Sequence, residues 1–180
     1  MTSQSNPRFV LDASVFIGAH RTYYSMDLCP GFWDCLLQEF HSGILLSIDN
    51  VRDELLDINI SEDVKPDALY KWTKAAPRSL FVPSSEQPVV DAYKDIMAWV
   101  YGHPQFLQDA KGRFASKADG WLVAYAQVHA ITLVTQEVYD PRIRKKVPIP
   151  NVCRQFNVPY LNTFEMLRQL GVRFDLSPTP

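Results

Sequence analysis

The stretch RFVLD, residues 8–12, decides the fold, because it is a short β-rich run that ends in a carboxylate. A continuous apolar run of this length predicts a strand that is buried on both faces of a parallel sheet. Similar runs occur at 44–48 (ILLSI), 131–135 (ITLVT) and 158–161 (VPYL), and a shorter strand is expected at 79–82. The chain therefore supplies five candidate strands.

Helical patterns separate these strands. Apolar residues recur at helical spacing between Phe32 and Phe40, and residues 89–100 carry a second amphipathic face. Residues 116–129 are apolar nearly all round, which predicts a buried helix after a loop at 102–117. Further helices are expected from an N-cap at Asn50 to Ile58, between Pro66 and Pro77, and after an N-cap at Asn162. Strands that alternate with helices imply the α/β class, with a parallel sheet covered on both faces.

Composition limits the function classes. The 180 residues are 47% apolar, which predicts one domain over residues 1–180, with a helical middle segment at about 60–115. The net charge is −2, so no overall cationic field attracts nucleic acid, and any site for a polyanion must be local. The three cysteines lack CxxC spacing, so we expect buried reduced thiols and neither a disulfide framework nor a zinc ribbon.

Targeting signals are not apparent in the sequence. The first residues, MTSQSNPRFV, lack the basic and then apolar layout of a secretion signal. No apolar run approaches the roughly 18 residues that a membrane-spanning helix needs. We therefore expect a cytoplasmic protein with no membrane partner.

Four carboxylates fall near one predicted edge of the sheet. Asp12 ends the first strand, and Glu54 is expected in the first turn of the helix that follows the second strand. The helix that starts near Ser116 and the strand after it have similar lengths of roughly 20 Å, so Asp119 and Glu137 should meet at the same edge. In parallel α/β folds, reactive groups collect at the carboxyl ends of the strands.

Such a cluster needs a counter-cation or protons. Two ionised carboxylates about 5 Å apart repel by roughly 3 kcal/mol at an effective dielectric constant near 20. Hard carboxylate oxygens without a neighbouring His or Cys favour Mg²⁺ or Mn²⁺ over zinc. Structural alternatives exist for single acids, because residues 116–119 (SKAD) also spell a helix capping box and a lone Asp often follows a strand. Four acids at one edge favour a metal site.

These residues lie in segments that resemble the successive motifs of PIN-domain nucleases. The segments are VLDAS at 10–14, VRDEL at 51–55, ADGWLVAYA at 118–126 and LVTQE at 133–137, and they cover nearly the whole chain in the family's order. Residues 145–153 and 162–167 further resemble a poorly characterised bacterial subgroup of PIN-like proteins, related to the ribonuclease toxins of toxin–antitoxin pairs. The fold that the resemblance implies is a PIN-like parallel sheet in the order 3-2-1-4-5.

The resemblance also implies roles for individual residues. The catalytic and metal-binding acids would be Asp12, Glu54, Asp119 and Glu137, with Ser14 and Thr135 as supporting polar residues. The family's fourth acid is commonly Asp, whereas this chain has the longer Glu137, which would contact Mg²⁺ or Mn²⁺ directly or through water. Asp140 is the alternative candidate for this fourth position. The implied reaction is hydrolysis of a phosphodiester bond that leaves a 5′-phosphate.

Local basic residues are the expected contacts for RNA. Five cations and no acid occur between residues 142 and 154: Arg142, Arg144, Lys145, Lys146 and Arg154. Lys111, Arg113 and Lys117 precede Asp119 as a second group; the alternative for either group is a solvated basic surface. The aromatic residues Tyr23, Tyr24 and Trp33 either stack on bases or belong to the core.

The resulting expectation is a Mg²⁺- or Mn²⁺-dependent endoribonuclease that acts as the toxin of a type II toxin–antitoxin pair. The expected partners are RNA, an antitoxin protein and a second copy of the chain, for which Trp72, Trp99 and Tyr101 are candidate interface residues. The first alternative is a non-catalytic PIN-like module that binds RNA or protein. A phosphatase of the haloacid-dehalogenase type is disfavoured, because Ser14 stands where that chemistry needs a second Asp.

Overall fold

A five-stranded parallel sheet forms the centre of the protein, for which a computed structural model describes residues 8–57 and 66–175. The strands are β1 (Phe9–Leu11), β2 (Leu45–Ile48), β3 (Phe81–Val82), β4 (Thr132–Val134) and β5 (Tyr160–Leu161). They pair in the order β3-β2-β1-β4-β5, and every pair is parallel. The predicted α/β class and the predicted strand order 3-2-1-4-5 are confirmed.

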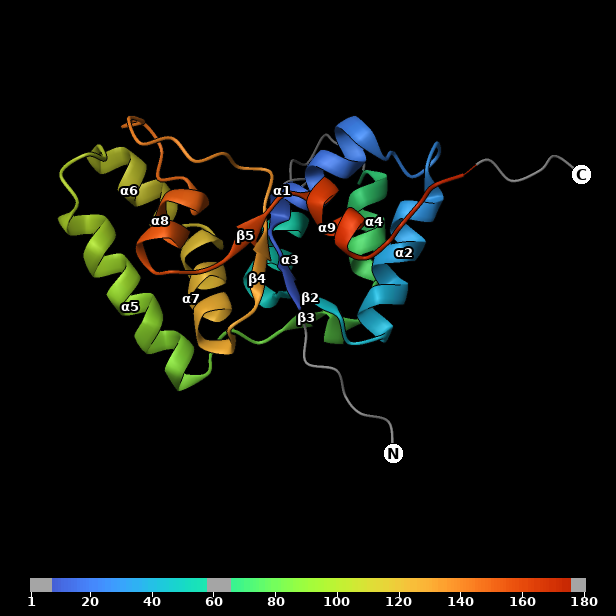
Figure 1. Cartoon of the computed structure of the whole chain (residues 1–180), viewed down its shortest axis with the longest axis horizontal. Helices are drawn as coiled ribbons and strands as arrows, with labels where there is room; N and C mark the ends of the chain where they lie inside the picture. Colours follow the sequence, from blue (N-terminus) through green and yellow to red (C-terminus); the bar gives the residue numbers. More distant parts are fainter. Residues whose placement is uncertain (1–7, 58–65, 176–180) are drawn as a thin grey trace, which may run out of the picture.

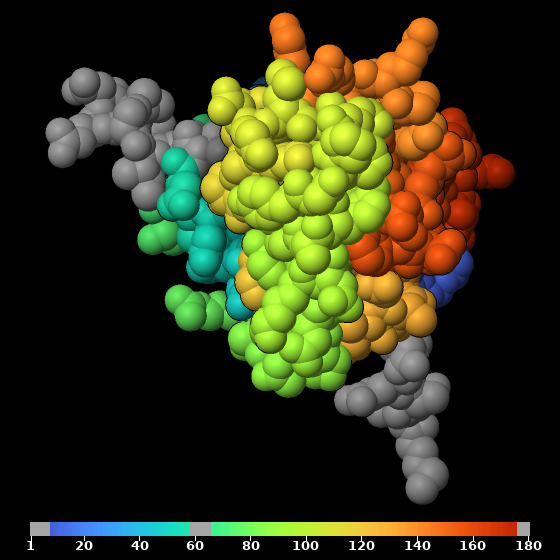
Figure 2. All heavy atoms as spheres, turned by 90° about the vertical axis from the view of Figure 1, so that its left-hand side faces the viewer, coloured from blue at the N-terminus to red at the C-terminus, as the bar shows by residue number. Residues whose placement is uncertain are grey.

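Helices cover both faces of this sheet. In chain order they are α1 (Ala13–Gly18), a π-helical turn (Ala19–Tyr23), α2 (Pro30–His41), α3 (Asp49–Asp57), α4 (Ala68–Ala75), a 3₁₀ turn (Arg78–Leu80), α5 (Gln87–Gly102), α6 (Gln108–Ala115), α7 (Asp119–His129), α8 (Ile149–Gln155) and α9 (Thr163–Gln169). Figure 1 shows α5 to α8 on one side of the sheet, and α1, α2, α4 and α9 on the other. Figure 2 shows α5 as the outermost helix of its layer, with the segment after β4 along the upper edge.

Three predictions about helix boundaries are wrong. The predicted loop at 102–117 contains α6, which forms because its otherwise polar sequence places Ala110 and Phe114 on one buried face. The predicted cap at Asn50 does not form, since α3 begins at Asp49 and the Asn50 side chain accepts a hydrogen bond from Ser84 Oγ. The buried helix begins at Asp119 and not at Ser116.

Other local predictions are confirmed. Asn162 caps α9 in a capping box, accepting from the Glu165 N–H while the Glu165 carboxylate accepts from the Asn162 N–H. Cys153 is buried, and all three cysteines are free thiols, although Cys29 and Cys35 are only half-buried. The predicted end of α3 at Ile58 lies outside the described residues.

One hydrophobic cluster, which joins the sheet to the helices around it, makes up the core. The sheet residues Val10, Leu11, Leu133 and Val134 are fully buried, because helices cover both faces.

Within the described residues, no helix is long and apolar enough to span a membrane.

Candidate metal and nucleic-acid site

The chain reverses its winding direction between β1 and β4. From β1 it proceeds outward to β2 and β3, and then it returns to β4 on the other side of β1. The two strands are paired in register from Phe9 opposite Thr132 to Leu11 opposite Val134. Their next residues, Asp12 and Thr135, therefore emerge side by side at the carboxyl edge, where open α/β sheets bind their ligands.

Asp12 is held at this edge by two hydroxyl groups. Thr135 Oγ1 donates to Asp12 Oδ2 over 2.9 Å, and Ser14 Oγ donates to the same oxygen over 2.5 Å. Each hydroxyl in turn accepts a backbone N–H, from Gln136 to Ser14 over 3.0 Å and from Glu137 to Thr135 over 3.2 Å. This chain of hydrogen bonds fixes Oδ2, and no described residue donates to Oδ1.

The charge on Asp12 is unfavourable in the free protein. The side chain is 4% exposed, and this burial is the main cause that raises the pKa of Asp12 from 3.8 to about 6. Repulsion from Glu137 and Glu54 raises it further, while the hydrogen bonds from Ser14 and Thr135 oppose the rise. Asp12 is therefore buried among like charges, and its only hydrogen-bond donors among the described side chains are the two hydroxyl groups.

Asp119 lies across the edge, at the first residue of α7. Its side chain is 8% exposed, and burial, followed by repulsion from Asp12, Glu137 and Glu54, raises the pKa of Asp119 well above its ordinary value. Its neighbour Gly120 lets α5 pack closely there, since a Cβ at this position would lie 2.9 Å from the Tyr93 ring. After burial, the charge of Asp12 is the largest cause of this rise, so the Asp119 carboxylate lies within electrostatic range of Asp12.

The capping alternative for residues 116–119 is not formed. Ser116 Oγ donates to the Arg113 carbonyl, and the N-cap position of α7 is Ala118, which has no capping side chain. No described residue donates a hydrogen bond to the Asp119 carboxylate. A role in helix capping therefore does not explain this buried acid.

Glu54 approaches from α3 and pairs with a lysine. Because α3 begins at Asp49, Glu54 lies in the second helical turn. The prediction that it lies in the first turn is wrong. Its Oε1 lies 3.4 Å from Lys117 Nζ, whereas its Oε2 is buried and has no hydrogen-bond partner among the described residues. Burial opposes the charge of Lys117, but Glu54 and Asp119 outweigh this effect and raise the pKa of the lysine. Lys117 thus partly neutralises this side of the cluster.

Glu137 differs from the other three acids, because the chain uses both of its oxygens. Oε1 pairs with Lys146 Nζ at 2.5 Å, and Oε2 accepts the Ile149 N–H at the start of α8 over 2.8 Å. Asp140, the alternative candidate, accepts the Arg142 N–H and is not among the charges that raise the pKa of Asp12 or Asp119. Direct metal ligation by Glu137 stays a prediction, while its ion pair with Lys146 is a feature of the structure.

The donor set fits a hard divalent cation in its chemistry. The oxygens without a hydrogen-bond donor from the described residues belong to Asp12, Glu54 and Asp119, and carboxylate oxygens are the ligands that Mg²⁺ and Mn²⁺ prefer. With the side chains as they stand, no three His, Cys, Asp or Glu residues of the described chain have the arrangement that holds an ion. In this arrangement Lys117 and Lys146 offset part of the acids' charge.

Four cations surround Asp119 on its outer side. Arg113, Lys117, Lys145 and Lys146 line a hollow of about 170 Å³ that also contains Asp119. Arg113 ties the two segments together, because its Nη2 donates to the Lys145 carbonyl over 2.6 Å. The structure therefore brings two members of each of the two predicted basic groups beside Asp119.

Other basic residues are placed differently. Arg142 and Arg144 are exposed in the segment between β4 and α8 that also carries Lys145 and Lys146. Arg154 stacks on the Tyr139 ring, with its Cζ 3.9 Å from the ring centroid. The prediction for Lys111 is wrong: its side chain is buried, and Nζ donates to the Tyr101 carbonyl over 2.7 Å. Lys111 therefore joins α5 to α6 and does not face the acids.

Most of the aromatic candidates belong to the core. Trp33 is buried and donates to the Tyr24 carbonyl, and the Tyr24 ring stacks on Phe32. Trp72 packs against Trp33, and Trp99 packs against Phe106 and Phe156. Tyr23, in the π-helical turn, and Tyr101, on α5, are each about half exposed.

A second hollow opens on the other flank of the acids, and sequence reasoning missed it. This β4–β5 pocket has a volume of about 510 Å³ and is lined by Thr135, Gln136, Glu137, Val138, Tyr139, Tyr160, Leu161, Asn162, Phe164 and Glu165. Its residues come from two separate segments, residues 135–139 and 160–165, that meet only because β4 pairs with β5. No local pattern marks them in the sequence.

Fold and site together define a doubly wound α/β protein with a buried acid cluster at its topological switch point. The chain belongs to the family described as "Domain of unknown function (DUF4411)", whose model matches residues 9–174. A search of curated proteins found no match.

Proposed function

We propose that the protein is a PIN-like endoribonuclease that depends on Mg²⁺ or Mn²⁺. The observation that carries the proposal is the buried pair of Asp12 and Asp119, whose pKa values are raised by burial and by the charges of neighbouring carboxylates. Perturbed carboxylates in a cleft at a switch point are the expected mark of a functional site. Ordinary structural roles are poor explanations for them, since Asp119 has no capping function and burying both charges is unfavourable.

The chemistry would depend on how the chain holds these acids. A divalent ion, when bound, lowers the pKa of a water molecule and offsets the charge that develops on a phosphodiester during hydrolysis. Asp12, Asp119 and Glu54 would hold the ion through the oxygens that accept no hydrogen bond from the described residues. Ser14 and Thr135 would orient Asp12, because both hydroxyl groups donate to the same carboxylate oxygen.

A polyanionic substrate fits the distribution of charge. Although the chain as a whole carries a net charge of −2, four cations line the hollow beside Asp119. Lys117 and Lys146 also contact the acids directly, so a phosphate at the acids would lie within reach of both. Arg142 and Arg144 would extend this phosphate-binding surface along the exposed loop.

The resemblance of the four acidic motifs to PIN-domain nucleases supports RNA as the substrate. On the same basis we propose that the protein works in the cytoplasm as the toxin of a toxin–antitoxin pair, and that it binds an antitoxin protein and forms a homodimer. These finer roles rest on the resemblance. A non-catalytic module that binds RNA or protein is the competing function.

Calorimetric titration with Mn²⁺, paired with an RNA cleavage assay, tests the proposal. We expect Mn²⁺ to bind and to raise the thermal midpoint of unfolding, because a ligand that binds only the folded state stabilises it by RT ln(1 + [L]/Kd), about 2.7 kcal/mol at 100 times Kd. We also expect cleavage of single-stranded RNA that stops on addition of EDTA and leaves 5′-phosphates. RNA binding without Mn²⁺ binding or cleavage would instead identify the non-catalytic module.

Ser14→Ala is expected to lower cleavage by about 10- to 100-fold, the effect typical of removing a residue that orients a metal ligand. The substitution removes one donor to Asp12 Oδ2 and the acceptor of the Gln136 N–H. The rate of cleavage at saturating Mn²⁺ measures the effect, and Ser14→Thr, which keeps the hydroxyl group, is the matched control. Equal rates for the alanine variant and the unchanged protein would rule out this role for Ser14.

A further inference from the structure

The β4–β5 pocket continues directly from the acid cluster. Thr135, which donates to Asp12, and Glu137, which raises the pKa of Asp119, also line this pocket. If the phosphate of a substrate lies at the acids, the neighbouring group of that substrate lies beside or inside the pocket. The chemistry of the pocket lining indicates which group this is.

The lining itself offers no cation to a phosphate. None of the ten described residues that form the pocket is Lys or Arg, and two of them, Glu137 and Glu165, are acids. The hollow on the opposite flank, beside Asp119, has the reverse character, with Arg113, Lys117 and Lys145 among its walls. The two hollows thus suit different parts of a nucleotide. The cationic hollow suits the phosphates, and the β4–β5 pocket suits an uncharged group.

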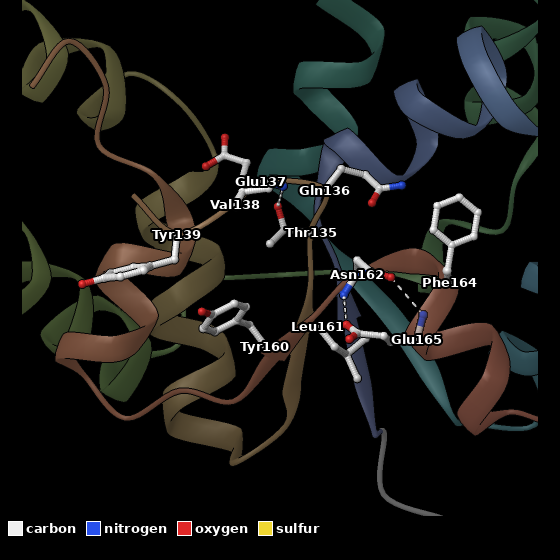
Figure 3. A pocket seen from close by; sticks show the side chains of 10 residues that line it. All are labelled: Thr135, Gln136, Glu137, Val138, Tyr139, Tyr160, Leu161, Asn162, Phe164 and Glu165. Carbon is white, nitrogen blue, oxygen red and sulfur yellow. Dashed lines mark hydrogen bonds between the residues drawn. The ribbon is translucent and has the colours of Figure 1, made fainter. Parts of the chain in front are cut away.

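Flat aromatic surfaces and amides characterise the pocket. Figure 3 shows Tyr139 and Tyr160 on one side and Phe164 on the other, with Gln136 and Asn162 between them. The Phe164 ring also makes a T-shaped contact with the Tyr23 ring, with the ring centroids 5.1 Å apart. Asn162 uses its side-chain oxygen to cap α9, which leaves its NH₂ group as a donor, and no described residue bonds to the Gln136 side-chain amide.

We propose that the β4–β5 pocket binds one unpaired nucleobase of the RNA strand whose phosphate lies at the acids, an inference that rests on the proposed function. Aromatic side chains stack on bases of any sequence, and side-chain amides hydrogen-bond to base edges. The volume of about 510 Å³ is within the usual range for small-ligand pockets and suits one base rather than a duplex. The protein therefore selects single-stranded RNA and holds it by a base next to the acids.

The test measures binding of single-stranded RNA without cleavage. Fluorescence anisotropy in the Asp12→Asn protein gives the affinity for a labelled oligoribonucleotide of about ten nucleotides and for copies in which one abasic nucleotide is moved along the strand. We expect one abasic position to weaken binding about tenfold, the size of one lost stacking interaction. Tyr160→Ala in the same background should weaken binding of the intact strand by a similar factor and make all abasic copies equivalent.

Matched variants separate stacking from other effects. Tyr160→Phe keeps the ring and should bind like the parent, and Tyr101→Ala removes a half-exposed tyrosine that lies on α5, away from the pocket. If Tyr160→Ala does not fold, the abasic series still answers, because it leaves the protein unaltered. A flat abasic profile, unchanged binding by Tyr160→Ala, or no RNA binding at all would overturn the base pocket.

The outcomes also distinguish this inference from the proposed function. One sensitive abasic position without cleavage by the unchanged protein would keep the base pocket and refute the nuclease. Metal-dependent cleavage with a flat abasic profile would keep the nuclease and refute the base pocket.

Discussion

Asp12→Asn should reduce metal-dependent RNA cleavage by more than about 100-fold. Mutating even a partner that only orients a metal ligand costs about 10- to 100-fold, so loss of the ligand itself should cost more. The amide is nearly the same size as the carboxylate, and its oxygen can still accept from Ser14 and Thr135. The substitution therefore removes the charge while keeping the shape of the site.

The same variant should be as stable as the unchanged protein or more stable in the absence of divalent ions. The ionised Asp12 is buried and repelled by Glu137 and Glu54, and the rise of its pKa from 3.8 to about 6 corresponds to about 3 kcal/mol at neutral pH. Neutralising the side chain removes this penalty. Thermal unfolding with EDTA present, measured beside the cleavage rate, reports both effects on one preparation.

The combination of lost activity and retained stability is the informative result. Asp34→Asn, which makes the same change on the exposed side of α2, is the matched control and should alter neither property. Cleavage by Asp12→Asn at the rate of the control would refute the catalytic role of Asp12. A large fall in the thermal midpoint would show instead that the carboxylate has a structural role.

Acidification should stabilise the metal-free protein between about pH 7.5 and pH 5. Burial and repulsion from neighbouring carboxylates raise the pKa values of Asp12 and Asp119 in the folded state, so the folded protein binds more protons than the unfolded chain in this range. The stabilisation is complete below the unfolded pKa near 3.8 and is lost as the pH rises through the folded pKa, which for Asp12 is about 6. Asp12 alone should contribute about 3 kcal/mol over the whole range down to below pH 3.8, of which about 1.4 kcal/mol falls between pH 7.5 and pH 5.

Urea unfolding across this pH range, with EDTA present, measures the effect. The free energy of unfolding should rise as the pH falls, and the rise should be smaller in Asp12→Asn, because that variant lacks the proton that Asp12 takes up. The exposed Asp27 and Asp91 have lowered pKa values and act in the opposite direction, but only at lower pH. If Asp12→Asn and Asp34→Asn show the same pH dependence as the unchanged protein, Asp12 does not titrate in this range.

Much of the fold followed from the sequence for a simple physical reason. A short run without polar alternation, such as Val10 and Leu11, is stable only where both faces of a strand are covered, and helices between such runs make the strands parallel. The acids that follow β1 and β4 then share an edge. The sequence does not predict α6, because most of its residues are polar and Phe114 is its only large apolar side chain. The helix is stabilised by the packing of Phe114 against the rest of the protein, which the local sequence does not show.

The sequence by itself determined the parallel sheet and which edge carries Asp12, Asp119 and Glu137. Only the tertiary structure decided which contacts each acid makes there. Lys117 pairs with Glu54 across 63 residues of chain, and both Glu137 oxygens have partners. Asp119 does not cap α7. The β4–β5 pocket likewise exists only where two distant segments meet. Hydrogen bonds and ion pairs act over a few ångströms in space, and local patterns do not record which distant side chains come within that range.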